Sequence, residues 1–179
     1  MKNKIIRKVT IVIQPEIIEF QMHHSEFLFL GREYPLNHPD FGMVWGDFFA
    51  SGGMDIIEPY RNKEYWLMEI YHKIYPEQDI FYIGSIVNEV TDIPKGWTLR
   101  KFPARDFIVI TTKWVETWDE AMKIGHGQTL NYAKTVQIPE GYIRYDEPGS
   151  QIKLIERENS VSKNGNRYEV WVPIKKLID

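Results

Sequence analysis

Residues 168–174, with the sequence YEVWVPI, decide the fold because their β-branched and aromatic side chains predict a strand close to the end of the chain. Side chains alternate along a strand, so every second residue from Tyr168 belongs to an apolar core face, and Glu169 and Trp171 share the other face. Within these seven residues, no Lys or Arg accompanies that pair. If the second face is solvated, nothing follows for function. If it lines a cavity, the pair suits a flat cationic ligand, because Trp attracts a cation by roughly 0.5–2 kcal/mol.

The composition predicts one globular domain or two small, fused halves. The chain has 179 residues, 43% hydrophobic and 26% charged residues, and a formal net charge of −3. Aromatic residues make up 14% of the chain, and such a surplus is typical both of a large core and of an aromatic pocket or interface.

Several classes of function are disfavoured by what the sequence lacks. There is no Cys, which excludes disulfides, thiol nucleophiles and thiolate metal sites. No apolar run approaches the ~20 residues of a membrane span, and the start of the chain does not resemble a signal peptide, so a cytoplasmic protein with no membrane partner is expected. The slightly acidic balance disfavours direct binding of nucleic acid. No pair of His has the i, i+4 spacing of metal ligands, and no phosphate loop or serine elbow occurs, so no metal and no cofactor are expected.

One helix is expected in the first half of the chain. Asp40 is suited to cap its start, and the apolar residues recur with the spacing of one helical face. Ser51-Gly52-Gly53 is expected to end it. The segment 59–77 fits either a helix or a strand. Strands are predicted in the first half over 8–22, 26–34, 80–90 and 97–102.

A second helix is expected from Thr117, which forms a capping box with Glu120. Gly125 and Gly127 each weaken a helix by about 1 kcal/mol relative to Ala, so a bend or a split is expected there. Asn164-Gly165 predicts a turn before the last strand. Further strands are predicted over 106–112, 142–145 and 151–156.

The order of elements repeats, and so does one short motif. Residues 93–97 (IPKGW) and 138–142 (IPEGY) both read Ile-Pro-charged-Gly-aromatic. The sequence therefore predicts one α+β domain over 1–179, built from two similar halves at roughly 8–103 and 104–179.

These motifs, in this order, resemble the GyrI-like effector-binding domain. The resemblance is carried by IPKG at 93–96, the strand 107–110, the helix from Thr117, IPEGY at 138–142 and the closing strand 168–174, and it extends from about residue 80 to the end. It implies two βαββ halves related by a pseudo-twofold axis, with an antiparallel sheet and two helices over a ligand cleft. It also implies a stand-alone domain without the helix-turn-helix of the related multidrug regulators.

The resemblance implies that an acidic residue on the last strand contacts cationic ligands, and Glu169 occupies that position. Trp171 is expected to act as a stacking wall. Trp45 and Phe49 lie on the helix edge that would border the cleft, and Tyr82 alternates away from its apolar neighbours. Each of these residues also has an ordinary structural interpretation, in the core or on the surface.

Three functions remain open from the sequence. The first is a receptor for a small amphipathic, cationic molecule. The second is a hydrolase of small hydrophobic electrophiles, in which Glu169 activates water and Tyr82 assists. The third is a protein-binding module or inhibitor that uses a sheet edge or an aromatic surface. The sequence does not indicate the oligomeric state.

Overall fold

The computed structural model describes residues 16–36, 40–66, 68–74, 78–147 and 150–177, and for 69–74, 78 and 79 the backbone alone. Its strands are β1 (Ile18–His24), β2 (Phe27–Pro35), β3 (Met68–Ile74), β4 (Gln78–Val87), β5 (Thr98–Phe102), β6 (Arg105–Thr111), β7 (Tyr142–Arg144), β8 (Leu154–Ser162) and β9 (Gly165–Lys176). Its helices are α1 (Phe41–Ala50), α2 (Gly53–Ile57) and α3 (Trp118–Ala133).

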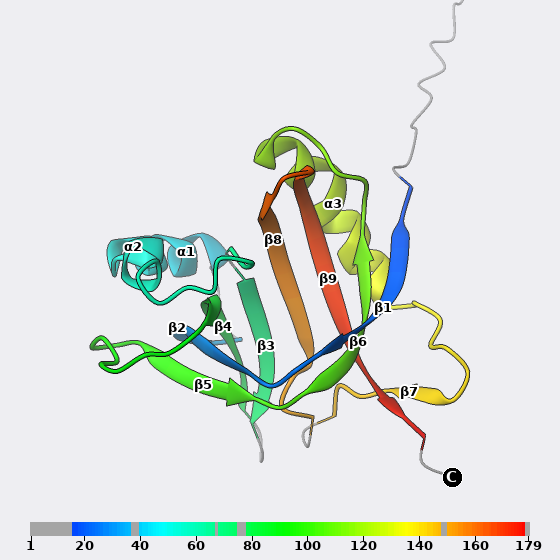
Figure 1. Cartoon of the computed structure of the whole chain (residues 1–179), viewed down its shortest axis with the longest axis horizontal. Helices are drawn as coiled ribbons and strands as arrows, with labels where there is room; N and C mark the ends of the chain where they lie inside the picture. The colour runs from blue at the N-terminus through cyan, green and yellow to red at the C-terminus, as the bar shows by residue number, and fades with distance from the viewer. Residues whose placement is uncertain (1–15, 37–39, 67, 75–77, 148–149, 178–179) are drawn as a thin grey trace, which may run out of the picture.

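The strands form one antiparallel sheet, and the two halves of this sheet have equivalent strands in mirrored positions (Figure 1). The order is β1-β6-β9-β8-β3-β4-β2-β5, with β7 added beside β9. The unit β2-α1-β3-β4 therefore mirrors β6-α3-β8-β9, and the two units meet where β3 pairs with β8. This confirms the predicted α+β fold of two βαββ halves. The short helix α2, which was not predicted, follows α1 directly.

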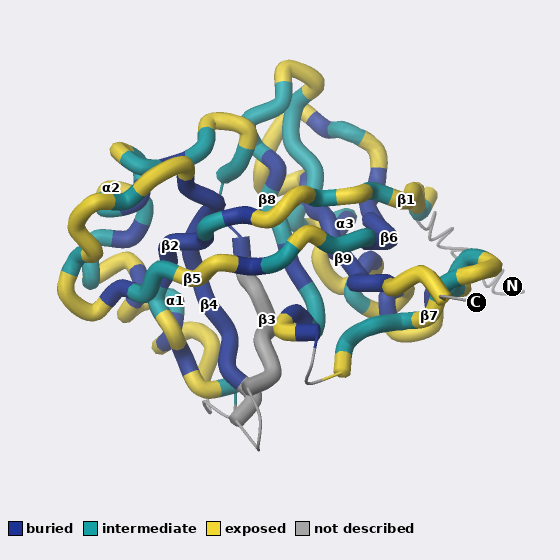
Figure 2. The backbone as a smooth tube through the Cα atoms, turned by 60° about the horizontal axis from the view of Figure 1, so that its bottom comes forward, coloured by how far each residue is buried: buried dark blue, intermediate teal, exposed yellow. Residues whose placement is uncertain are grey.

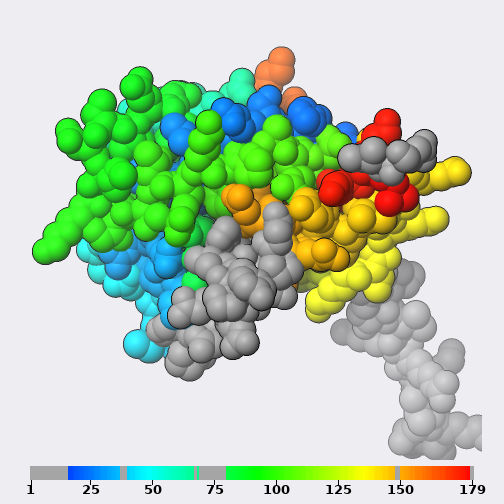
Figure 3. Space-filling model, turned by 90° about the horizontal axis from the view of Figure 1, so that it is seen from below, coloured from blue at the N-terminus to red at the C-terminus, as the bar shows by residue number. Residues whose placement is uncertain are grey.

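Each half also receives a strand at its outer edge. β1 pairs with β6 of the second half although it lies in the first part of the sequence, and β5 pairs with β2. Seen from below, the blue of β1 lies beside the green of the β5–β6 region, and the end of β9 lies beside β7 (Figure 3).

The two faces of the sheet are packed differently. On one face, a single core extends through both halves, from Phe29 and Tyr82 to Val109 and Trp171. On the other face, the helices produce two separate cores, one under α1 and α2 and one under α3. Figure 2 shows the buried stretches of β4 and β9 that carry these cores. Because the cores on the helix side do not join, space is left between α1 and α3.

Both predicted helix starts are confirmed. The carboxylate of Asp40 accepts hydrogen bonds from the backbone N–H groups of Gly42 and Met43, at 2.8 and 3.2 Å. The hydroxyl of Thr117 accepts one from the N–H of Glu120 at 3.2 Å.

The expected bend or split of the second helix is wrong, because α3 is continuous over 16 residues. A Cβ atom on Gly125 would lie 2.8 Å from the Cβ of Tyr168 on β9. Gly125 therefore lets α3 lie close against the last strand, and this packing outweighs its low helix propensity.

The ambiguous segment 59–77 forms no long helix in its described part, and its second portion is strand β3. The predicted strand over 8–22 is confirmed only from Ile18, since residues 8–15 lie outside the described residues. The strand predicted over 151–156 instead runs from Leu154 to Ser162.

Two glycines let β2 and β4 approach each other. Gly31 and Gly84 lie opposite one another in the register of these strands. A Cβ atom on Gly84 would overlap the carbonyl oxygen of Leu30 and would lie 2.6 Å from the Cα of Gly31. Because these are backbone atoms, the overlap could be relieved only by moving the strands apart.

We predict that Gly84→Ala lowers the free energy of unfolding by about 1–3 kcal/mol or more, as overpacking typically does. Urea denaturation followed by circular dichroism measures this. Gly127→Ala is the matched control, because its Cβ meets nothing within 4 Å and Ala favours a helix by about 1 kcal/mol. Equal midpoints for Gly84→Ala and the wild type would contradict the close approach.

Candidate functional site

A cleft of about 320 Å³ lies between α1 and α3, over the strands where the two halves meet. Its walls are mainly aromatic and aliphatic, and its floor carries two carboxylates. The lining residues are Trp45, Phe49, Met68, Trp118, Met122, His126, Glu156, Glu158 and Tyr168. A volume of this size and an apolar lining with few polar groups are typical of small-molecule sites.

Glu156 is the buried carboxylate of the cleft, with 5% of its surface exposed. It accepts a hydrogen bond from the hydroxyl of Tyr168 on β9. The Nε2 atom of His126 on α3 lies 3.8 Å from its Oε2 atom. Glu156 therefore brings a carboxyl group to a place where α3, β8 and β9 meet.

Glu158 is the second carboxylate, two residues further along the same face of β8. It accepts a hydrogen bond of 2.8 Å from the indole Nε1 of Trp118. Burial raises the pKa of Glu158, and the hydrogen bond from Trp118 opposes that rise. Burial has removed water from this carboxylate, and a cation bound beside it would stabilise its charged form.

The predicted residues Trp45 and Phe49 form the α1 wall of this cleft. Their rings stack with centroids 5.9 Å apart and planes 28° apart. Phe49 is 61% exposed although it is large and apolar. The structure thus places both residues in the cleft, and their contact with a ligand stays a prediction.

Glu169 lies on the opposite face of the sheet from the cleft. Tyr168 and Val170 pack under α3, so Glu169 between them points away from the helices. It lines neither this cleft nor a second cavity of about 610 Å³ beside the β1–β2 turn. With 2% of its surface exposed, it is among the most buried charged groups that the structure describes.

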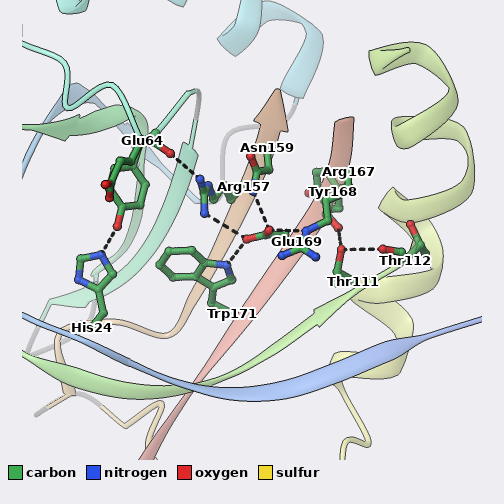
Figure 4. A network of polar contacts seen from close by, with 11 residues as sticks. His24, Glu64, Thr111, Thr112, Arg157, Asn159, Arg167, Tyr168, Glu169 and Trp171 are labelled. Atoms are coloured by element: carbon green, nitrogen blue, oxygen red, sulfur yellow. Dashed lines mark hydrogen bonds and ion pairs between the residues drawn. The ribbon is translucent and has the colours of Figure 1, made fainter. Parts of the chain in front are cut away.

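Glu169 is surrounded by donors (Figure 4). Arg167 donates from Nε at 2.7 Å, and Arg157 from Nη1 at 3.4 Å. Asn159 and the indole of Trp171 add hydrogen bonds of 2.9 Å each. Burial alone would raise the pKa of Glu169, but the two guanidinium groups and these donors together hold it below the ordinary value of 4.5.

The counter-charges of Glu169 come from within the chain. Arg167 lies on the same face of β9 as Glu169, two residues before it and just upstream of the YEVWVPI stretch. Arg157 lies directly opposite Glu169 on β8. Because the oxygens of Glu169 already accept hydrogen bonds from these side chains, the carboxylate is poorly suited to activate a water molecule, as the hydrolase hypothesis requires.

Trp171 and Tyr82 also lie away from the cleft. Trp171 is fully buried in the core that joins the two halves. The hydroxyl of Tyr82 donates to Glu33 at 3.1 Å and accepts from Arg100 at 3.0 Å. Of the five candidate residues from the sequence, Trp45 and Phe49 therefore lie together, and Glu169, Trp171 and Tyr82 lie on the other side of the sheet.

Sequence reasoning missed the two carboxylates of β8, since the strand predicted there ended at residue 156, and a β-bulge would also have misled a count of strand pairs. Counting pairs back from the turn at Asn164 places Glu158 opposite Glu169. The register shifts by one residue between Asn159 and Ser162, and this brings Glu158 opposite Tyr168 instead. Such a shift moves every later side chain to the other face.

Metal and membrane sites gain no support from the described part of the chain. In it, no three His, Cys, Asp or Glu side chains are grouped to hold a metal ion. No helix within it is long and apolar enough to cross a bilayer.

Comparison with solved structures relates the whole sheet and its helices to known proteins. The sequence matches no protein-family model, and no curated protein matches it significantly. The crystal structure of the EcmrR C-terminal domain matches 90% of this chain and 99% of its own, with a TM-score of 0.55 and 12% identity. The chain has the fold of the EcmrR C-terminal domain. This confirms, at the level of the fold, the predicted resemblance to GyrI-like effector-binding domains.

Two further structures share this fold. SAV2435 bound to tetraphenylphosphonium matches 88% of this chain and 94% of its own, with a TM-score of 0.60 and 10% identity. EcmrR in its complex with DNA matches 90% of this chain, with a TM-score of 0.55 and 10% identity. The match spans 58% of that EcmrR chain.

We predict that Glu169→Gln lowers the free energy of unfolding by about 3–5 kcal/mol at pH 7, because it leaves two partly buried guanidinium groups without their counter-charge. A lowered pKa in the folded state stabilises at pH values above the ordinary pKa of 4.5 and stops doing so as the pH falls through the lowered value. The difference from the wild type should therefore shrink in acid. Denaturant titrations at several pH values measure it.

Glu140→Gln, an exposed loop position, is the control for the change in net charge and should leave stability unchanged. A Glu169→Gln protein as stable as this control at pH 7 would show that the ion network has no structural role.

Proposed function

We propose that this chain binds a small amphipathic, cationic molecule in the cleft between α1 and α3. The observation that carries the proposal is the pair of carboxylates, Glu156 and Glu158, on the floor of a cleft with aromatic walls. The ligand's charge would lie over β8, and its apolar groups would lie between the two helices.

The cleft supplies both kinds of attraction that such a ligand needs. The rings of Trp45, Phe49 and Trp118 offer faces to aromatic groups and to the cation itself, and each cation–ring contact is worth roughly 0.5–2 kcal/mol. The carboxylates add a charge attraction that requires no particular direction. A site built from flat rings and undirected charge accepts ligands of varied shape, which supports the multidrug character of the proposal.

The proposal assigns the charge role to Glu156 and Glu158 in place of Glu169. Glu169 already has two guanidinium partners, and a cation beside it would compete with Arg157 and Arg167. Trp45 and Phe49 keep the role expected from the sequence.

The shared fold adds support. SAV2435, which has this fold, is known with tetraphenylphosphonium bound, and this ligand is a lipophilic aromatic cation. The same compound is therefore a suitable first probe for this chain.

We predict that tetraphenylphosphonium binds the wild type and that Glu156→Gln and Glu158→Gln each weaken binding about tenfold, which corresponds to 1.4 kcal/mol. Each change removes one charge from the cleft while keeping the size and an acceptor oxygen of the side chain. Isothermal titration calorimetry measures the affinities. Phe49→Ala should weaken binding as well, through the loss of ring contacts.

Two controls separate charge in the cleft from other effects. Glu140→Gln changes the net charge equally but lies outside the cleft, so it should bind as the wild type does. Neutral triphenylphosphine oxide should bind the wild type and both cleft variants alike. If the cleft variants keep full affinity for tetraphenylphosphonium, or if the wild type does not bind it, the proposal is wrong.

A further inference from the structure

One titratable base lines the cleft beside its buried carboxylate. The ring of His126 packs edge-on against the ring of Tyr168, with centroids 5.2 Å apart and planes 70° apart. Its Nε2 atom lies 3.8 Å from Glu156, and 52% of its side chain is exposed. His126 is therefore open to solvent on one side and close to the cleft charge on the other.

The charge of His126 changes what Glu156 can offer a ligand. A neutral imidazole leaves the carboxylate's negative charge to attract a bound cation. An imidazolium pairs with Glu156 and adds a positive charge to the cleft wall, so a cation must compete with it. Histidine is the side chain that typically changes charge between pH 5 and 8.

The other charged groups near His126 do not reverse this effect. β8 contributes Glu156 and Glu158, and β9 contributes Tyr168. The α1 residues of the lining, Trp45 and Phe49, do not ionise. On α3 itself, Lys123 is exposed and is not part of the cleft lining. Within the described lining, His126 is thus the one base beside two acids.

We propose that His126 is a specificity-determining residue of the cleft, which favours cationic ligands when its ring is neutral and disfavours them when its ring is protonated. This inference rests on the proposed function. It adds that the same cleft changes its preference with pH, from cations at mildly alkaline pH toward neutral aromatic ligands at mildly acidic pH.

Calorimetric titrations at pH 5.5 and pH 8.0 test this, with tetraphenylphosphonium and neutral triphenylphosphine oxide as probes. The wild type should bind the cation about two- to fivefold more tightly at pH 8.0, the range expected for a partly exposed ion pair. It should bind the neutral probe equally at both pH values. His126→Gln, which keeps a polar side chain without the ring, should lower the ratio for the cation, and Glu158 accounts for any ratio that is left.

Glu158 requires its own control, because its raised pKa would also weaken cation binding in acid. The titrations are therefore repeated in Glu158→Gln protein, where the ratio should persist with His126 and disappear with His126→Gln. Glu156→Gln in the same background should weaken cation binding at both pH values, and part of the ratio should remain because the imidazolium keeps its positive charge beside the cation.

The outcomes separate the two proposals. If the wild type binds the cation at both pH values and, in Glu158→Gln protein, His126→Gln leaves the ratio unchanged, the role of His126 is wrong and the proposed function stands. If the wild type binds the cation at neither pH, the proposed function itself is wrong.

Discussion

The register between β8 and β9 determines which charged side chains face the helices, and the rest of the site depends on it. Side chains of opposite residues point to the same face, so Glu158 accompanies Tyr168 and Arg157 accompanies Glu169. The bulge between Asn159 and Ser162 fixes this choice. Without the one-residue shift, the acidic and basic residues of β8 would exchange faces, and the cleft would carry a positive charge.

The two faces of this strand pair therefore have different tasks. On one face, Glu169 with Arg157 and Arg167 forms a closed ion network within the core that joins the halves. Burying such charges is costly, and the network is stable only because every member has partners. On the other face, Glu156 and Glu158 lie at the floor of a cleft between separate helical cores. Charge is satisfied inside the protein on the first face, and in the function proposed above it attracts a ligand on the second.

The sequence predicted the features that depend on local pattern. Asp40 and Thr117 cap the helices as expected, and the repeated element order corresponds to the mirrored sheet. The turn before the last strand forms at Lys163 and Asn164, one residue earlier than the predicted Asn164-Gly165, because Gly165 already pairs with Ser162. The sequence could not predict features that depend on contact between distant residues. Gly125 lies in an unbroken helix because of Tyr168, 43 positions away in the sequence. Glu169 looked unpaired for two reasons: Arg157 reaches it across the hairpin, and Arg167, two residues upstream on the same face, lies outside the seven residues from which the face was judged.

Two indole groups report separately on the two faces. Trp118 donates its Nε1–H to Glu158 in the cleft, and Trp171 donates its own to Glu169 in the ion network. We would therefore follow the tryptophan indole signals by ¹H–¹⁵N NMR, assigned by single Trp→Phe variants, during a titration with tetraphenylphosphonium. Binding in the cleft predicts that the Trp118 and Trp45 signals shift while that of Trp171 stays in place. A shift of Trp171 with Trp118 unchanged would place the ligand at Glu169 and contradict the assignment of the cleft.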